Sequence, residues 1–210
     1  GVDNSTFTNN GTASNYGAGI EVANRSAARI DNSTMNNNFN DGVGVFWDSF
    51  ARVAGSTLSN NGSFDPFDAG FQIAHHSSVR SNDNTVSGNG YAAVEVGQQS
   101  LFRSNGGDTF TTVNTCNGFC APVFEAYRNG YVEIRGGTAT ADATNGLLAN
   151  VIHQSLLEMR NGATATGDVD FSNLAFVRMR NSMTAFNGSL LGCDGSNTGP
   201  GFSICLDQAP

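Results

Sequence analysis

The sequence has no lysine and only four prolines among its 210 residues. All ten cationic side chains are arginines, and the formal net charge is −8. A chain with so few cations lacks the basic face that phosphate backbones and anionic lipids require, so we expect no general affinity for nucleic acid. No apolar run approaches the roughly 18 residues of a membrane span. No charged-then-apolar leader follows Gly1, so a signal peptide is expected to be absent or already removed.

Helical periodicity over ten or more residues is also missing. The chain instead contains 26 glycines, many asparagines and 39% hydrophobic residues, including 15 phenylalanines. So many large apolar side chains do not fit a chain that cannot form a core. The composition therefore predicts an ordered fold with many tight turns.

One short pattern recurs along nearly the whole chain, a strand centred in most copies on arginine, then a turn, then threonine with an apolar neighbour. Its copies are AARIDNSTM (27–35), FARVAGSTL (50–58), SVRSNDNTV (78–86), LFRSNGGDTF (101–110), VEIRGGTA (132–139), LEMRNGATA (157–165) and VRMRNSMTA (177–185). A second short strand precedes each copy: GIEV (19–22), GVGV (42–45), GFQI (70–73), AVEV (93–96), VFEA (123–126), LANV (148–151) and DVDF (168–171). The repeat lengths are 23, 28, 23, 30, 25 and 20 residues. Fixed strands with variable connections predict a parallel β-helix, because the strands must stack in register while the corners can extend as loops.

Registering the coils on one another predicts three columns of inward side chains. They are Ile20, Val43, Phe71, Val94, Phe124, Ala149 and Val169; Val22, Val45, Ile73, Val96, Ala126, Val151 and Phe171; and Ala28, Ala51, Val79, Phe102, Val132, Leu157 and Val177. A small residue stands at each bend between the two strands: Ser26, Ser49, Ser77, Ser100, Gly130, Ser155 and Ala175. Asparagine runs follow the third strand and are expected to turn the chain into the next coil, since asparagine tolerates the left-handed conformation.

This repeat resembles that of the right-handed parallel β-helix superfamily, which includes pectate-lyase-like enzymes, phage tailspikes and secreted surface proteins. The resemblance covers roughly residues 5–190 and is architectural, because no motif matches the catalytic residues of a particular member. It implies an all-β, single-domain right-handed parallel β-helix, a solenoid of about seven coils of 20–30 residues, over residues 1–190. Residues 191–210 are expected to form a C-terminal disulfide-bearing loop or cap. The chain opens inside the pattern without a cap, so upstream sequence is expected to have been removed.

The four cysteines fall into two close pairs, Cys116/Cys120 and Cys193/Cys205, in segments with turn character. Without clustered histidines this spacing is a poor zinc signature, so no metal site is expected. Two local disulfides are favoured over four free thiols. Disulfides imply an oxidising compartment, and hence an extracellular or cell- or virion-surface location.

Two outward columns on one face of the solenoid point to a partner. The charged column is Arg29, Arg52, Arg80, Arg103, Glu133, Glu158 and Arg178, with Arg135, Arg160 and Arg180 beside it. Like charges stacked at the strand spacing of about 4.8 Å repel and need anionic partners, either from loops of the same chain or from a neighbouring subunit or acidic ligand. The apolar column is Ala27, Phe50, Ser78, Leu101, Tyr131, Leu156 and Phe176. A stripe of this length favours a partner chain over a covering loop, so we expect a homo-oligomer, most simply a trimer.

Two further outward columns carry chemistry. The acidic column is Glu21, Gly44, Gln72, Glu95, Glu125, Asn150 and Asp170. Glu95 and Glu125 are expected to be adjacent, as in a retaining glycosidase pair or a calcium site, although a solvated or salt-bridged ladder is the commoner explanation. The planar column is Asn24, Trp47, His75, Gln98, Arg128, His153 and Asn173. Rings beside amides suit a sugar-binding groove, and an ordinary polar sheet face explains the column equally well. His75 and His76 make a poor metal site if they alternate sides on a strand.

These columns favour a non-catalytic structural or binding module of a secreted or surface protein, self-associating and able to bind carbohydrate through Trp47, His75 and Gln98. The interface residues would be Phe50, Leu101, Tyr131, Leu156, Phe176, Arg29, Arg52, Arg80 and Arg103. The alternative is a polysaccharide lyase or glycoside hydrolase acting on an acidic polysaccharide. Glu95 and Glu125 would then do acid–base work, while Arg80 and Arg103 hold uronate carboxylates. No cofactor is expected.

Overall fold

The computed structural model describes residues 1–12, 17–62, 68–112, 122–141, 146–180, 183–188, 190–191 and 204–205. The regular secondary structure of these residues is entirely β-strand, in pieces of two to five residues. All the strand pairings are parallel. Among these residues no helix is present that is long and apolar enough to cross a membrane.

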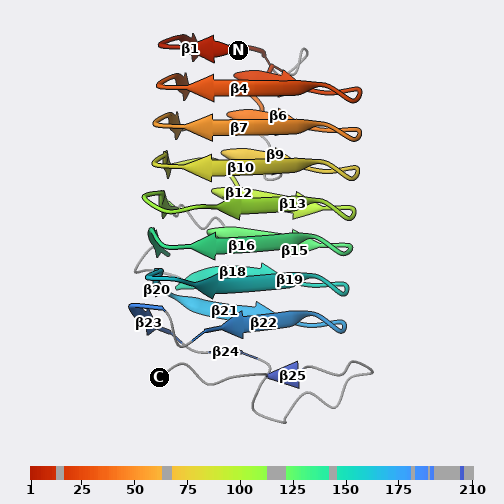
Figure 1. Cartoon of the computed structure of the whole chain (residues 1–210), viewed down its shortest axis with the longest axis vertical. Helices are drawn as coiled ribbons and strands as arrows, with labels where there is room; N and C mark the ends of the chain where they lie inside the picture. The colour runs from red at the N-terminus through yellow and green to blue at the C-terminus, as the bar shows by residue number, and fades with distance from the viewer. Residues whose placement is uncertain are drawn as a thin grey trace.

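The strands stack into three parallel sheets that run along the solenoid axis (Figure 1). Sheet A contains β1 (Val2–Asp3), β4 (Ala27–Asp31), β7 (Phe50–Ala54), β10 (Ser78–Asn82), β13 (Leu101–Ser104), β16 (Tyr131–Arg135), β19 (Leu156–Arg160), β22 (Phe176–Met179) and β25 (Ile204–Cys205). Sheet B contains β2 (Thr6–Thr8), β5 (Thr34–Asn36), β8 (Thr57–Ser59), β11 (Thr85–Ser87), β14 (Thr109–Thr111), β17 (Thr138–Thr140), β20 (Thr164–Thr166) and β23 (Ala185–Asn187). Sheet C contains β3 (Ile20–Val22), β6 (Val43–Val45), β9 (Phe71–Ile73), β12 (Val94–Gly97), β15 (Phe124–Tyr127), β18 (Leu147–Val151), β21 (Asp168–Phe171) and β24 (Leu190–Leu191).

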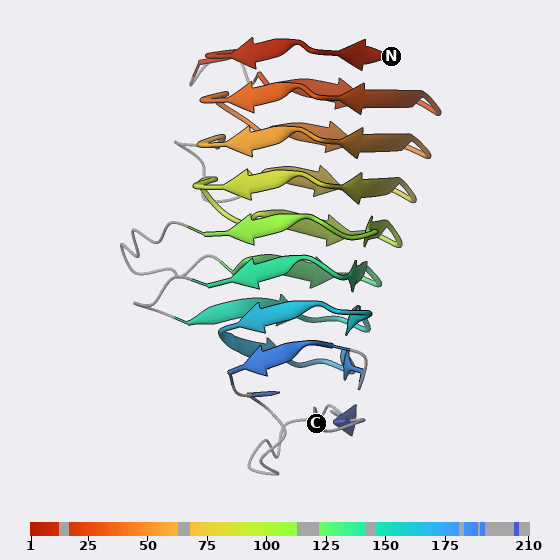
Figure 2. The ribbon, with the colours of Figure 1, turned by 60° about the vertical axis from the view of Figure 1, so that its left-hand side comes forward.

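Each coil passes through sheets C, A and B in turn, and β3 to β23 form seven such sets of three strands within the described residues (Figure 2). The predicted all-β parallel solenoid is therefore confirmed. The predicted register is also confirmed: Val94 pairs with Phe71 and Phe124, and Arg80 pairs with Arg52 and Arg103. In the paired strands, each side chain therefore lies directly above or below the side chain at the equivalent position of the next coil.

The inward columns form one continuous core between the three sheets. Its largest side chains are fully buried, and four phenylalanine rings from neighbouring coils pack with centroids 5.2–5.9 Å apart: Phe71, Phe102, Phe110 and Phe124. Burial of this apolar surface is the main favourable term in folding. The outward side chains do not pack in this core, so they are available for ion pairs or for binding.

The corner between sheets C and A has the same conformation in all seven coils. Two successive residues adopt positive φ, as at Trp47 and Asp48 (56° and 58°) and at His75 and His76 (56° and 62°). Left-handed backbone costs about 1 kcal/mol per non-glycine residue. Hydrogen bonds between coils offset that cost: Asp48 N donates to His75 O at 2.9 Å, and Ser49 N donates to Ser77 Oγ at 3.1 Å. The planar column thus lies on a turn, and the expectation that His75 and His76 alternate as strand residues is wrong.

In the upstream coils, the corner after sheet B is made by a ladder of buried asparagines, as predicted. Asn38 donates from Nδ2 to Oδ1 of Asn61 at 2.8 Å, and Asn61 donates in the same way to Asn89 at 3.0 Å. Each amide is completely or almost completely buried, so these bonds satisfy groups that water cannot reach. The preceding residues Asn37 and Asn60 take the left-handed conformation.

The C-terminal segment contributes two short strands to the solenoid. β24 pairs with β21, and β25 pairs with β22. The predicted boundary at residue 190 and the cap over 191–210 stay predictions. Cys116, Cys120 and Cys193 lie outside the described residues, and only the backbone of Cys205 is described, so the two disulfides stay predictions as well.

Candidate functional site

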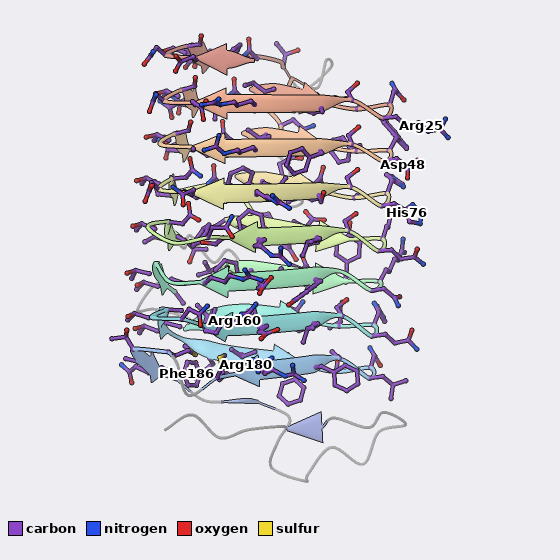
Figure 3. All side chains as sticks on the ribbon, in the orientation of Figure 1. Arg25, Asp48, His76, Arg160, Arg180 and Phe186 are labelled. Carbon is purple, nitrogen blue, oxygen red and sulfur yellow. The ribbon has the colours of Figure 1, made fainter. Side chains whose placement is uncertain are left out.

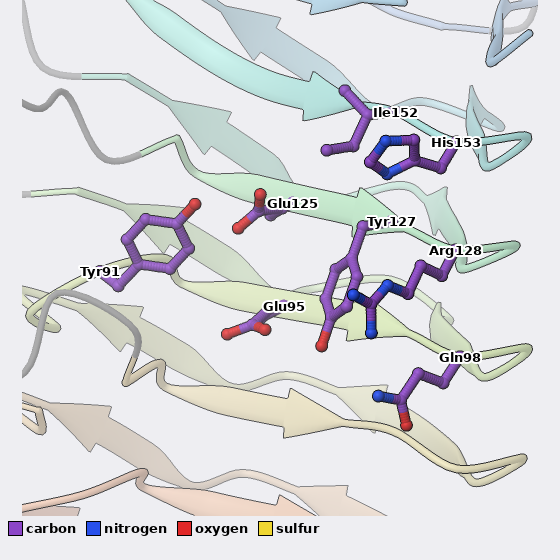
Figure 4. A pocket seen from close by; sticks show the side chains of 8 residues that line it. All are labelled: Tyr91, Glu95, Gln98, Glu125, Tyr127, Arg128, Ile152 and His153. Carbon is purple, nitrogen blue, oxygen red and sulfur yellow. The ribbon is translucent and has the colours of Figure 1, made fainter. Parts of the chain in front are cut away.

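A pocket of about 300 Å³ opens on the outer face of sheet C (Figure 4). It is lined by Tyr91, Glu95, Gln98, Glu125, Tyr127, Arg128, Ile152 and His153. The pocket brings together both predicted carboxylates and members of the planar column. Tyr91, Tyr127 and Ile152 were missed by the sequence analysis, because each lies outside the columns on which that analysis relied.

Glu95 and Glu125 are neighbours across β12 and β15, as predicted. Because Val94 and Val96 point into the core, the residue between them must point outward. Neighbouring strands lie about 4.8 Å apart, so the two carboxyl groups are held close together. Glu95 is nevertheless only 7% exposed. The pair is therefore a largely buried one, in contrast to an ordinary solvated ladder.

Each carboxyl group is bonded by one phenol and one amide. Glu95 accepts hydrogen bonds from the hydroxyl of Tyr127 and from Nε2 of Gln72, the latter at 3.3 Å. Glu125 accepts from the hydroxyl of Tyr91 and from Nδ2 of Asn150 at 3.3 Å. These donors come from four different coils, so the stacking of the solenoid assembles the site.

A glycine makes room for one of the two phenols. Gly97 is the register partner of Tyr127, and the Tyr127 ring lies over it. A Cβ atom on Gly97 would lie 2.2 Å from Cζ of that ring. Figure 4 shows the resulting arrangement, in which the Tyr127 hydroxyl reaches the side of Glu95 and Tyr91 faces Glu125. Any larger residue at position 97 must push Tyr127 away from Glu95.

Burial controls the protonation of the pair. Desolvation, with added repulsion from Glu125, raises the pKa of Glu95 to about 7. Desolvation also raises the pKa of Glu125, opposed by its bonds to Tyr91 and Asn150. Two carboxylates this close cannot both ionise easily, so near neutral pH the pair shares a proton. The site then presents one acidic donor beside one carboxylate.

A third buried acid lies nearby on the same side of the solenoid. Asp41 is fully buried, and its Oδ1 accepts from the backbone N–H of Ala69 at 2.9 Å. Its Oδ2 has no hydrogen-bond partner among the described residues. Burial raises the pKa of Asp41 well above its usual value and thus favours the neutral acid. Within the described residues, no group of three or more histidine, cysteine, aspartate or glutamate side chains is arranged to hold a metal ion.

The turns between sheets C and A form an exposed ridge, here called the turn ridge. Its first positions are Asn24, Trp47, His75, Gln98, Arg128, His153 and Asn173. Trp47 is 48% exposed, and its ring stacks on that of His75 with centroids 5.7 Å apart and planes 14° apart. A second hollow of about 380 Å³ lies beside it, lined by Asn24, Arg25, Trp47 and Asp48. The three residues predicted to bind carbohydrate are therefore consecutive rungs of one ridge.

The downstream arginines of sheet A have carboxylate partners within the chain. Glu133 is completely buried and bonds Arg103 Nε at 2.5 Å, Arg135 Nε at 2.6 Å and also Arg160. Burial would raise the pKa of Glu133, but the three guanidinium groups lower it to about 2. Glu158 bonds Arg180 at 2.5 Å and accepts from the Tyr131 hydroxyl at 2.9 Å. Figure 3 shows Arg160 and Arg180 on this face. These carboxylate partners, Glu133 and Glu158, belong to the charged column itself. Loops of the same chain, one of the sources considered from the sequence, do not supply them.

The upstream arginines are paired differently. Arg29 bonds Asp31 of its own strand. Within the described residues, Arg52 and Arg80 have no carboxylate within 4 Å, and the Arg80 guanidinium lies 5.9 Å from the ring centroid of Phe50. Arg80 and Arg103 therefore lie on sheet A, whereas Glu95 and Glu125 lie on sheet C. The arginine that the structure places beside the two carboxylates is Arg128.

Comparison with known proteins gives one match. Residues 1–106 match the family model described as a right-handed β-helix region. None of the curated proteins and none of the solved structures matches the chain.

Glu95 should make the protein less stable at alkaline pH. Its folded pKa of about 7 lies above the unfolded value of roughly 4.3, so the stability that it contributes below the unfolded value is lost as the pH rises through 7. At about 1.4 kcal/mol per pKa unit, the loss between pH 5 and 8 amounts to a few kcal/mol. Glu95→Gln keeps the shape without the charge, so its free energy of unfolding should fall less over this range. Urea unfolding at both pH values measures the difference, with the exposed Glu21→Gln as control. Parallel pH dependences for the original protein and Glu95→Gln would contradict the assignment.

Proposed function

Because this chain belongs to the right-handed β-helix family, we propose that it acts as a rigid scaffold, a non-catalytic binding module of an extracellular or surface-exposed protein. Its ligand in this proposal is a carbohydrate that lies along the turn ridge. The observation that carries the proposal is the stacked pair of Trp47 and His75, of which the tryptophan is half-exposed.

Three properties of the ridge support sugar binding. Its backbone is held by hydrogen bonds between successive coils, as from Asp48 N to His75 O, so the rings are positioned before a ligand arrives. The Trp47 ring is backed by the stacked His75 ring and is half-exposed, so its exposed surface can receive the C–H face of a sugar. Polar side chains flank them for the hydroxyl groups: Asn24, Arg25, Asp48, His76 and Gln99. Sites of this type combine an aromatic platform with a few polar groups that set orientation.

Removal of the tryptophan ring tests the carbohydrate proposal. Trp47→Ala should weaken binding to glycans that the original protein selects on a glycan array, by about tenfold or more, because ring stacking contributes roughly 1 kcal/mol beyond area burial. Leu174→Ala is the matched control, since Leu174 is 41% exposed and occupies the same kind of left-handed turn. Titration calorimetry with an array hit measures both. Equal affinities for Trp47→Ala and the original protein would overturn the proposal.

Self-association through the downstream apolar column is the structural part of the proposed function. Arg103, Arg135, Arg160 and Arg180 are held in ion pairs by Glu133 and Glu158, which offset part of the positive charge on this half of sheet A. Next to those ion pairs stand Tyr131, Leu156 and Phe176, which are adjacent in register, the last of them 41% exposed. An apolar stripe beside arginines that are already held in ion pairs suits a second copy of the chain better than water.

A substitution in this stripe tests the assembly. We expect light scattering at micromolar concentration to give a mass of several chains of 21.9 kDa, a trimer being the simplest closed ring. Phe176→Ser should shift that mass toward one chain, while Leu174→Ser, a change of equal exposure off the sheet, should leave it unchanged. A single-chain mass for the original protein would rule out self-association.

Hydrolysis of glycosidic bonds at the sheet C pocket is the second candidate function. It is favoured by one observation, a buried carboxyl pair in which Glu95 has a pKa of about 7. Such an acid can protonate a glycosidic oxygen near neutral pH, while Glu125 attacks the anomeric carbon or activates water, and one water molecule is consumed overall. Arg128 at the rim would favour an acidic sugar.

The two functions separate in an activity screen. A panel of acidic and neutral polysaccharides is assayed for new reducing ends and for the ultraviolet absorbance of unsaturated ends. If the pocket is catalytic, Glu95→Gln should reduce turnover by at least 100-fold, the usual worth of an acid–base group. Glu21→Gln, which changes an exposed member of the same column, should retain activity. Absence of product with every polysaccharide would eliminate the hydrolase candidate.

A further inference from the structure

We propose that the upstream half of sheet A is an anion-binding surface for an acidic glycan, with its carboxylate or sulfate groups held by Arg52 and Arg80. This surface is separate from the turn ridge and goes beyond the function proposed for it. The glycan would run along the solenoid axis, because the arginine column runs in that direction.

Charge is distributed unevenly over the chain. The strands of sheet A from β1 to β22 contain seven arginines and four carboxylates, a net charge of +3 in a chain whose total is −8. The rest of the molecule is therefore strongly acidic. Sheet A is the face on which an anion meets attraction rather than repulsion.

Among the described residues of sheet A, two arginines that are adjacent in register and lack a carboxylate within 4 Å occur only upstream. Downstream, Glu133 and Glu158 occupy the charged column and bind four arginines between them. Upstream, the same column consists of arginines alone. Arg52 and Arg80 are exposed, adjacent in register and without a carboxylate within 4 Å among the described residues.

The backbone keeps these two arginines next to each other. Their strands are hydrogen-bonded neighbours about 4.8 Å apart, so both side chains leave the sheet at adjacent points and can reach the same anion. An oxyanion placed between them removes their mutual repulsion and accepts charge-assisted hydrogen bonds from both. The planar guanidinium group matches a carboxylate or sulfate in this way, which makes arginine more selective than a point charge.

An apolar surface beside the arginines favours a sugar as the carrier of the anion. Phe50 and Arg52 are two residues apart on β7 and thus share its outer face. Arg80 lies over the Phe50 ring, with 5.9 Å between its Cζ atom and the ring centroid. A glycan can pack a ring against Phe50 while its acidic group reaches the arginines. A nucleic acid also carries a row of anionic groups, so single-stranded DNA is the competing ligand in the test.

The test compares two double variants that change the net charge equally. Arg52→Gln/Arg80→Gln removes the proposed site, and Thr85→Asp/Thr138→Asp lowers the net charge by the same two units at exposed positions of sheet B. Calorimetry is run with a carboxylated glycan (alginate), a sulfated glycan (heparin) and a neutral one (dextran), at low and moderate salt. The original protein should bind alginate, heparin or both, more weakly at higher salt, and the first double variant should lose about tenfold or more in affinity. The control variant should stay close to the original, and circular dichroism should show that both fold.

Several results would overturn the proposal. These are absence of binding to both acidic glycans, equal losses in the two double variants, or equally tight binding of single-stranded DNA. A drop in molecular mass in the Arg52→Gln/Arg80→Gln variant would assign the arginines to a second copy of the chain. Preference for alginate or heparin identifies the group as carboxylate or sulfate. Trp47→Ala should retain acidic-glycan binding at this face, so failure of the turn-ridge proposal leaves this result interpretable.

Discussion

The structure depends on the parallel hydrogen-bond register between coils. Each residue in a strand lies about 4.8 Å from the residue at the equivalent position of the next coil. Apolar residues, serines and asparagines benefit from this arrangement, because each can pack against or bond to its own kind. The phenylalanine rings of the core and the Asn38–Asn61–Asn89 ladder are two results of the same constraint. A charged residue in such a column instead meets a like charge or requires a compensating one.

Repulsion between like charges in a column is relieved in two ways in this molecule, on sheet C and on downstream sheet A. At a third position, on upstream sheet A, the described residues do not relieve it. On sheet C, burial and mutual repulsion keep a proton on the Glu95–Glu125 pair, with a phenol bonded to each carboxyl group. On downstream sheet A, Glu133 replaces an arginine in the column and bonds three others, so its pKa falls instead of rising. At Arg52 and Arg80, neither solution applies among the described residues. The Glu95–Glu125 pair on sheet C thus holds a proton, whereas Glu133 on sheet A is ionised, because the groups around them differ.

The register and the inward columns could be predicted from the sequence, because hydrophobic alternation repeats in every coil and one residue of slip would expose the core. The adjacency of Glu95 and Glu125 followed from the same register. The ring of Tyr127 over Gly97 could not be predicted, since it depends on a side-chain rotamer across two coils. The left-handed conformation of Trp47 was also missed, because tryptophan does not signal positive φ and inter-coil bonds hold the conformation. The burial of Glu133 similarly depends on three long side chains that meet only in space.

In the repeated turn between sheets C and A, backbone groups provide the stability and the side chains are available for recognition. Its shape is held by backbone hydrogen bonds and by the hydroxyl group of the serine that follows. The side chains at positions such as 24, 47, 75 and 98 therefore do not pack in the core. One rung can therefore be exchanged without altering the backbone of the rungs above and below it. A protein built in this way can acquire new ligands by point substitution along an edge, at a cost of about one left-handed residue that the fold already tolerates. The edge is in effect a linear array in which each coil offers a side chain that the core does not constrain.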